Sequence, residues 1–380
     1  MEKQLEIHPF PYDAESDGFI AALSSAVCAA KRYSDNTPYW CSRKGCYCKR
    51  CGDCQGQSLG KTQLSVYHCL LAASGLAFGF DYPEDDSVGR HTIPNIPIGW
   101  RWNYDFLAGI MNFAGLSFAR YQSKTVEEIR AIIKDSIDAG YPAMAANHQV
   151  YSDEMAWVSC WKIIKGYTDN GITVMRHGGE VRDETSGRHE DIIVITGTAD
   201  CPRNGEGKRD YLDVLKGIYA VLSDPSHDVL EEEIMTDLSN VTAENAPMLS
   251  YKLMGINGVS IEARWHAAEA FTSKDNLLYS LAEASPVGPN KEKAAQEQLA
   301  DLFYKRYIAD GNNETHGIGW KIWGCLHAGP QTGYLPEAES FQLIQQPAVQ
   351  EELKRLFRIV FDNDRAVGKG ILEILERAHN

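Results

Sequence analysis

Residues 161–171 read Trp161-Lys162-Ile163-Ile164-Lys165-Gly166-Tyr167-Thr168-Asp169-Asn170-Gly171, and they predict a β-strand followed by a tight turn. Branched and aromatic residues are typical of strands, and Asn-Gly is a strong hairpin signal because both residues tolerate a positive φ. We expect the strand over 158–166 and its return over 172–176. Two further strands are expected over 141–146 and 191–196, so this part of the chain should carry the β-structure.

A helix precedes the first of these strands. Residues 125–139 place Ile129, Ile132, Ile133 and Ile137 at helical spacing, and Gly140 follows as a helix end. Other helices are expected over 19–31, 66–80 and 103–116.

From about residue 210 onward the pattern contains helices only. We expect them over 211–222, 227–238, 261–273, 275–284, 291–310 and 350–377, the last with a break at Gly368-Lys369-Gly370. A polar stretch at 198–209 separates the two patterns. The sequence therefore predicts an α+β fold in two domains: residues 1–200, with a Cys-rich insertion at 40–60, and an all-helical domain at 205–380.

The composition is that of an ordinary globular protein, with 380 residues, 44% hydrophobic and 23% charged. A net charge of −15 argues against nucleic acid or an anionic membrane as the main partner. No apolar signal core follows Met1, and no run approaches the roughly 18 apolar residues of a membrane span. We therefore expect a cytoplasmic protein, whose ten cysteines serve metal binding or catalysis before disulfides.

The first candidate site is the pair Gln63 and Cys69, six residues apart at the start of the expected helix over 66–80. A cysteine in the first turn of a helix feels the positive end of the helix dipole, which favours the thiolate. A glutamine upstream can donate a hydrogen bond to an oxyanion that forms beside the sulfur. The pair therefore predicts nucleophilic catalysis through a thioester.

Two motifs make this part of the chain resemble a known superfamily. Ile137-Asp138-Ala139-Gly140-Tyr141-Pro142-Ala143-Met144 is similar to the entry strand of bacteriocin-processing, papain-like cysteine peptidases, and 161–171 is similar to their strand and hairpin. The helical remainder is closer to the butirosin-biosynthesis acyltransferases of that superfamily. The resemblance implies a papain-like domain, with Cys69 as nucleophile and Gln63 in the oxyanion hole. It also implies acyl or aminoacyl transfer from a carrier thioester to an amine, or hydrolysis, in specialised metabolism.

The sequence departs from the superfamily pattern at the base. Cys160 occupies the position of the catalytic histidine, and the orienting Asp or Asn would fall near Arg176 and His177. A thiol cannot replace imidazole as a base near neutral pH, so His148 is our candidate for that role. The alternative is a catalytically inactive papain-like domain that binds a peptide, a small molecule or a metal.

A second candidate site is the cysteine cluster formed by Cys41, Cys46, Cys48, Cys51 and Cys54. Pairs of thiols two residues apart are typical of zinc sites. The C-x2-C-x2-C run also fits a [4Fe–4S] cluster, for which Cys201, followed by Pro202, would be the remote ligand. Uncoordinated or oxidised thiols are the third possibility, and metal or redox sensing is then a third function.

Other motifs carry less information. The chain has no G-x-G-x-x-G, P-loop or H-E-x-x-H motif, so no nucleotide cofactor is expected. The segment Arg264-Trp265-His266-Ala267-Ala268-Glu269-Ala270-Phe271 is interpreted as core packing on an amphipathic helix. The expected partner of the protein is a small-molecule, peptidyl or acyl-carrier substrate, and the oligomeric state is left open.

Overall fold

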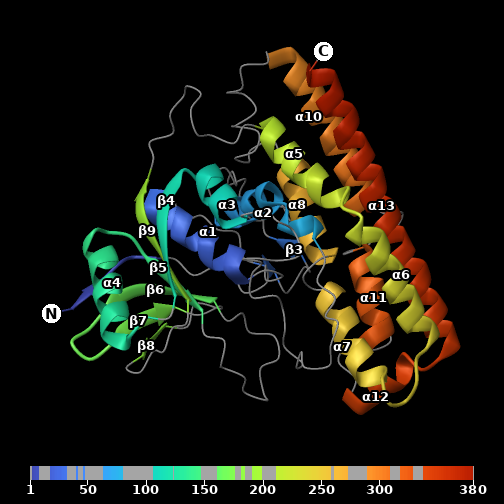
Figure 1. Ribbon diagram of the computed structural model, residues 1–380, viewed down its shortest axis with the longest axis horizontal. Helices are drawn as coiled ribbons and strands as arrows, with labels where there is room; N and C mark the ends of the chain where they lie inside the picture. Colours follow the sequence, from blue (N-terminus) through green and yellow to red (C-terminus); the bar gives the residue numbers. More distant parts are fainter. Residues whose placement is uncertain are drawn as a thin grey trace. The chain divides into compact units, whose positions relative to one another are not determined.

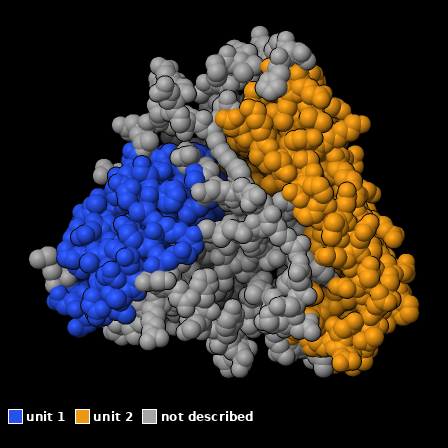
Figure 2. All heavy atoms as spheres, viewed as in Figure 1, with its two compact units in different colours: residues 1–70, 95–210, 274–284 blue, residues 71–94, 211–273, 285–380 orange. Residues whose placement is uncertain are grey.

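A computed structural model of the protein describes residues 2–7, 18–31, 40–41, 46–47, 63–79, 106–122, 124–146, 161–175, 181–184, 191–198, 211–257, 261–272, 289–308, 317–327 and 337–379 (Figure 1). The chain divides into two compact units, each drawn in its own colour in Figure 2. These units differ from the expected domains in two segments. Leu71–Pro94 belongs to the helical unit, and Lys274–Ala284 belongs to the first unit. The protein is thus an α+β chain with an antiparallel sheet and a C-terminal helical region.

The first unit is built on a seven-stranded antiparallel sheet with the order β4-β9-β5-β6-β7-β8. The short β1 pairs with Gly166 and Tyr167 of β6, beyond the residues of β6 that pair with the start of β5. A Cβ on Gly166 would lie 2.6 Å from the carbonyl oxygen of Lys3, so a glycine is needed where β1 approaches. The bounds are β1 (Lys3–Gln4), β4 (Leu116–Gln122), β5 (Ala143–Ala146), β6 (Trp161–Tyr167), β7 (Ile172–Met175), β8 (Val181–Glu184) and β9 (Asp191–Thr198).

Helices cover both faces of this sheet. On one face, Ile129, Ile133 and Ile137 of α4 (Val126–Asp138) pack on alternate strand residues, which include Ala143. On the other face, α1 (Gly18–Lys31) contacts the same strands, β5, β6 and β9, and residues of opposite parity are buried there: Met144, Ile163, Ile193 and Ile195. Figure 1 shows α1 and α4 on opposite sides of the strands. The period-2 alternation of each strand therefore supplies two apolar faces.

The ends of α4 follow from its sequence. The Glu128 amide donates to the Thr125 hydroxyl at 3.2 Å, and the Thr125 amide donates to the Glu128 carboxylate at 2.8 Å. This reciprocal capping box satisfies two backbone donors that the helix leaves unpaired. Gly140 follows the helix with φ of 89°, a conformation that favours glycine. The helix predicted over 125–139 is therefore confirmed to within one residue at each end.

The predicted hairpin is also confirmed. β6 and β7 pair up to Tyr167 and Ile172, and the Thr168 amide donates to the Gly171 carbonyl at 2.9 Å. The Thr168 hydroxyl accepts hydrogen bonds from the amides of Asn170 and Gly171, at 3.3 and 3.1 Å. The threonine side chain thus organises the turn between the two strands.

The described residues of the second unit form helices joined by turns and contain no strand. Its longest element is α13 (Pro347–His379), which contacts α5, α6, α10 and α11. Its other elements are η2 (Leu76–Phe78), α5 (Tyr211–Leu222), α6 (Ser226–Ser239), α7 (Ala246–Ile256), α8 (Glu262–Thr272), α10 (Pro289–Phe303), the π-turn η5 (Tyr304–Ile308), α11 (Gly317–His327) and α12 (Glu337–Leu343). Leu353, Phe357 and Phe361 of α13 lie in a core with residues of α6, α7 and α11.

The break predicted at Gly368-Lys369-Gly370 is wrong, because α13 continues through it. A Cβ on Gly370 would collide with Leu302 of α10, so this glycine permits close helix packing and does not end the helix. The helix predicted over 275–284 lies outside the described residues. Within the described residues, no helix has both the length and the apolar character that crossing a bilayer requires.

Candidate functional site

The predicted nucleophile Cys69 lies inside a helix. The helix α2 (Gln63–Ser74) begins at Gln63, so Cys69 is its seventh residue. The expectation of a thiol in the first turn is therefore wrong. On a regular helix, positions six residues apart are separated by about 9 Å along the axis and about 120° around it. Gln63 and Cys69 are therefore not adjacent positions of α2, and their joint role stays a prediction.

Burial removes a second condition for nucleophilic chemistry at Cys69. The side chain is 0% exposed, and its neighbours Tyr67, His68 and Leu70 are buried as well. The His68 ring packs edge-on against the Tyr67 ring, with centroids 6.1 Å apart. All residues of α2 from Val66 to Ser74 are buried, so this part of the helix is a core element. In this conformation Cys69 behaves as a small core residue.

The other predicted partners of Cys69 lie outside the described residues. These are His148, Cys160, Arg176 and His177. The described residues begin again directly after Cys160, at the start of β6 (Trp161), and stop directly before Arg176, at the end of β7 (Met175). The expected roles of His148 and of Cys160 therefore stay predictions.

The cysteine cluster is described at two positions. Strands β2 (Trp40–Cys41) and β3 (Cys46–Tyr47) form an antiparallel hairpin in which Cys41 faces Cys46. Directly paired residues of antiparallel strands have Cα atoms about 4.5–5.5 Å apart, a separation compatible with one shared metal ion or one disulfide. Cys48, Cys51, Cys54 and Cys201 lie outside the described residues. Over the part of the chain that is described, no group of three or more metal-ligating side chains occurs.

A site that the sequence did not predict lies in the helical unit. Arg264 of α8 and Asp364 of α13 form an ion pair whose side chains are 1% and 2% exposed. The guanidinium donates from Nε to Asp364 Oδ1 at 2.9 Å and from Nη2 to Oδ2 at 2.8 Å. It also donates to the carbonyls of Ala77 and Phe78 in η2, at 3.0 and 2.9 Å. Arg264 therefore joins three elements of one unit through charge-assisted hydrogen bonds.

Tyr307 completes this network. Its hydroxyl donates to Asp364 Oδ1 at 2.7 Å. Burial, and next the nearby Asp364 charge, raise the pKa of the phenol well above its ordinary value, so it remains a donor. Phe303 lies against both Tyr307 and Phe78, with centroids 5.7 and 5.8 Å away, and stacks on Phe271 at 4.2 Å. The aromatic side chains keep water from the ion pair, so its electrostatic interactions are weakly screened.

A cavity of about 240 Å³ adjoins this network. The turn between α5 and α6 supplies Asp224, α6 supplies His227, and α13 supplies Phe361 and Asp364. His227 is only 6% exposed, and burial lowers the pKa of its imidazole to about 4, against the opposing effect of the Asp364 charge. The imidazole is therefore uncharged at neutral pH.

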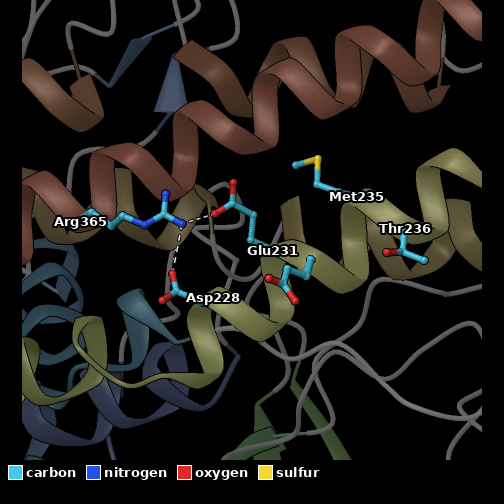
Figure 3. A pocket seen from close by; sticks show the side chains of 6 residues that line it. Asp228, Glu231, Met235, Thr236 and Arg365 are labelled. Atoms are coloured by element: carbon cyan, nitrogen blue, oxygen red, sulfur yellow. Dashed lines mark hydrogen bonds and ion pairs between the residues drawn. The ribbon is translucent and has the colours of Figure 1, made fainter.

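A second, more open hollow of about 610 Å³ lies along α6. Figure 3 shows Arg365 reaching from α13 toward Asp228 and Glu231 of α6. The Arg365 guanidinium lies 3.2 Å from Asp228 and forms a second ion pair with Glu231. Glu232, Met235 and Thr236 line the rest of the hollow.

The sequence contained one signal for the helical site. Arg264 lies in a segment otherwise interpreted as core packing, and a buried arginine requires an anionic partner. Asp364 follows 100 residues later in a different helix, so no local spacing connects the two.

Comparison with known proteins places the chain in no group: no protein-family model, no curated protein and no solved structure matches it. What the fold and the sites define is a two-unit α+β protein with one sheet-based and one helical part.

Proposed function

We propose that the chain is a ligand-binding protein whose sheet-based unit does not use Cys69 as a nucleophile. One observation carries the proposal: Cys69 is fully buried in the second turn of α2. The substitution of Cys160 for the expected histidine supports the same conclusion from the sequence. A papain-like arrangement remains our interpretation of this unit, as a scaffold that binds a peptide or a small molecule in a reducing compartment such as the cytoplasm.

Acyl or aminoacyl transfer through Cys69 is the second candidate, because Gln63 is the first residue of α2. The start of a helix is the end that stabilises an anion, so a residue there is suited to an oxyanion hole. This function requires that Cys69 become accessible during turnover, with His148 as the base. Its substrate would be an acyl group on a carrier or a small molecule.

Site-resolved alkylation separates the two candidates. The full chain is treated briefly with iodoacetamide at neutral pH, with and without denaturant, and each cysteine is quantified by mass spectrometry. We expect Cys69 to be protected in the native protein and to be labelled slowly compared with Cys325, which is half-buried. Burial raises the pKa of the Cys325 thiol to about 11, so even that residue should react slowly. Labelling of Cys69 before Cys325 would contradict the binding proposal.

Thioester hydrolysis supplies the matched functional control. Cys69→Ala and Cys28→Ala each remove a buried thiol of the first unit, but only Cys69 is a candidate nucleophile. Under our proposal both variants hydrolyse an activated thioester at the rate of the parent chain. A loss confined to Cys69→Ala would establish the acyl-transfer function.

For the cysteine cluster we propose one metal centre, with Cys48, Cys51 and Cys54 among its ligands. The backbone register of β2 and β3, in which Cys41 is the partner of Cys46, is consistent with this proposal. Anaerobic preparation followed by elemental analysis should yield one zinc per chain, or iron and sulfide in the amounts of a [4Fe–4S] cluster. Full alkylation of all five thiols, with neither metal present, would refute this assignment.

A further inference from the structure

The two hollows of the helical unit share one boundary. Both the cavity of about 240 Å³ and the more open hollow of about 610 Å³ are lined by Asp228 and Arg365. The ion pair between these two side chains, at 3.2 Å, is visible in Figure 3. The hollows are therefore adjacent.

Negative charge predominates around this boundary. Asp224 and Asp228 line the inner cavity, and Glu231 and Glu232 line the outer hollow. Among the described residues that line either space, Arg365 is the single basic one, and four carboxylates therefore share one guanidinium. Asp364 adds no net charge because Arg264 pairs with it. Concave surfaces of one sign concentrate ions of the opposite sign.

The inner cavity contributes features that an acidic surface alone does not have. His227 is buried in its wall, and because burial holds the imidazole pKa near 4, the ring brings no positive charge at neutral pH. A neutral imidazole supplies one donor and one acceptor. Leu222 and Phe361 give the cavity an apolar side. A volume of about 240 Å³ corresponds to roughly eight water molecules, enough for a short organic molecule.

We propose that the helical unit binds a small organic cation, an alkyl chain with a primary ammonium group, in the cavity between the α5–α6 turn and α13. Asp224 and Asp228 face the ammonium group, His227 provides a neutral hydrogen-bonding partner, and Leu222 and Phe361 contact the alkyl part. The apolar wall favours such a ligand over a bare metal ion, and the carboxylates exclude an anion. The site belongs to the helical unit, so it does not depend on the function of Cys69.

Isothermal titration of the full chain with putrescine (1,4-diaminobutane) tests the proposal. The uncharged isostere 1,4-butanediol is the matched ligand control, and magnesium chloride tests for a general affinity for cations. We expect saturable binding of putrescine that weakens at higher salt, since the attraction is electrostatic. At constant ionic strength, neither control compound should bind at the same concentration or displace putrescine.

Asp224→Asn is the decisive variant. The Asp224 carboxylate accepts a hydrogen bond from the Ser226 amide at 2.9 Å, and the asparagine carbonyl can accept the same bond. The turn is thus preserved while one charge is removed. We expect the affinity for putrescine to fall about tenfold, which corresponds to about 1.4 kcal/mol. Glu244→Gln, on an exposed carboxylate outside both linings, is the matched control and should leave the affinity unchanged.

Three results would overturn the assignment. Absence of heat from putrescine binding at millimolar concentration would show that no such site exists. An equal loss of affinity for putrescine in Asp224→Asn and Glu244→Gln would show that the binding is only a general attraction of cations to an acidic protein. Equal binding of 1,4-butanediol, or displacement of putrescine by magnesium, would exclude recognition of an organic ammonium group.

Discussion

Each unit contains an aspartate that pairs with a basic side chain and accepts a hydrogen bond from a tyrosine, but only one of the two ion pairs is exposed to water. In the sheet-based unit, Asp138 pairs with Lys134 and accepts a hydrogen bond from the Tyr167 hydroxyl at 2.8 Å. The side chains of Lys134 and Asp138 are 45% and 39% exposed. The hydrogen bond from Lys134, and next that from Tyr167, lower the pKa of Asp138.

In the helical unit the ion pair of the corresponding cluster is enclosed, with side chains 1% and 2% exposed. Asp364 pairs with Arg264 and accepts from Tyr307, and the guanidinium also serves two backbone carbonyls. The comparison teaches that geometry alone does not set the energetic importance of an ion pair. Water can solvate either partner of the exposed pair once the other is removed, whereas a lone charge in the buried cluster has no such replacement.

The largest expected effect is that of Arg264→Ala. The change leaves Asp364 and the carbonyls of Ala77 and Phe78 without the guanidinium, and the free energy of unfolding should fall by about 3–5 kcal/mol. The matched variant Lys134→Ala in the exposed cluster should leave stability within experimental scatter. Urea unfolding of the full chain, followed by circular dichroism, provides both values. Equal destabilisation by the two variants would abolish the distinction between the clusters.

A double variant sharpens the same comparison. Arg264→Met with Asp364→Leu removes both charges, so no buried ion is left without a partner. We expect this double variant to be more stable than Arg264→Ala. If it is less stable, then packing and not charge dominates the contribution of this network.

The next effect concerns pH and His227. Burial places the folded-state pKa near 4, below the ordinary 6.5, so the unfolded chain binds the proton more readily between these values. The contribution of His227 is therefore fully present above about pH 6.5 and decreases as the pH falls toward 4. The difference corresponds to about 3 kcal/mol. Unfolding measured from pH 7 to 4 should show this slope, and His227→Gln should remove most of it.

The smallest expected effect comes from the two tyrosines. Tyr307→Phe removes a hydrogen bond to a buried carboxylate and should cost about 1–3 kcal/mol. Tyr167→Phe removes a similar bond to Asp138, whose side chain is 39% exposed, so water can solvate that carboxylate instead and the change should cost less. Thermal unfolding of both variants gives the ranking directly. A reversed order would mean that Arg264 alone satisfies Asp364.

The parts of the fold that could be predicted from the sequence have local causes. Thr125 and Glu128 form a capping box within four residues, and Asn170-Gly171 forms a turn within four. The strand β4 was not predicted, because its residues show no clean alternation of buried and exposed side chains and it pairs with the distant β9. Long-range pairing of this kind leaves no periodic signal in one sequence.

The candidate sites were harder to predict for the same reason. The interval from Gln63 to Cys69 indicated nucleophilic catalysis by Cys69. That interpretation requires Cys69 to lie in the first turn of its helix, but α2 starts at Gln63 instead of near Val66. The pairing of Arg264 with Asp364 spans 100 residues, and no rule of local spacing connects them. Only the three-dimensional structure shows which distant charges share a core.

This spacing also has a consequence for the time course of synthesis. A ribosome adds about 5–20 residues per second, so Arg264 is made roughly 5–20 s before Asp364. During most of that interval, Arg264 is present in the nascent chain but its partner Asp364 has not yet been made. The apolar residues of α13 that complete the core are also absent. The helical unit therefore depends on a late segment of its own chain, and a nascent polypeptide halted within this interval would expose both an uncompensated charge and an unfinished apolar surface to chaperones.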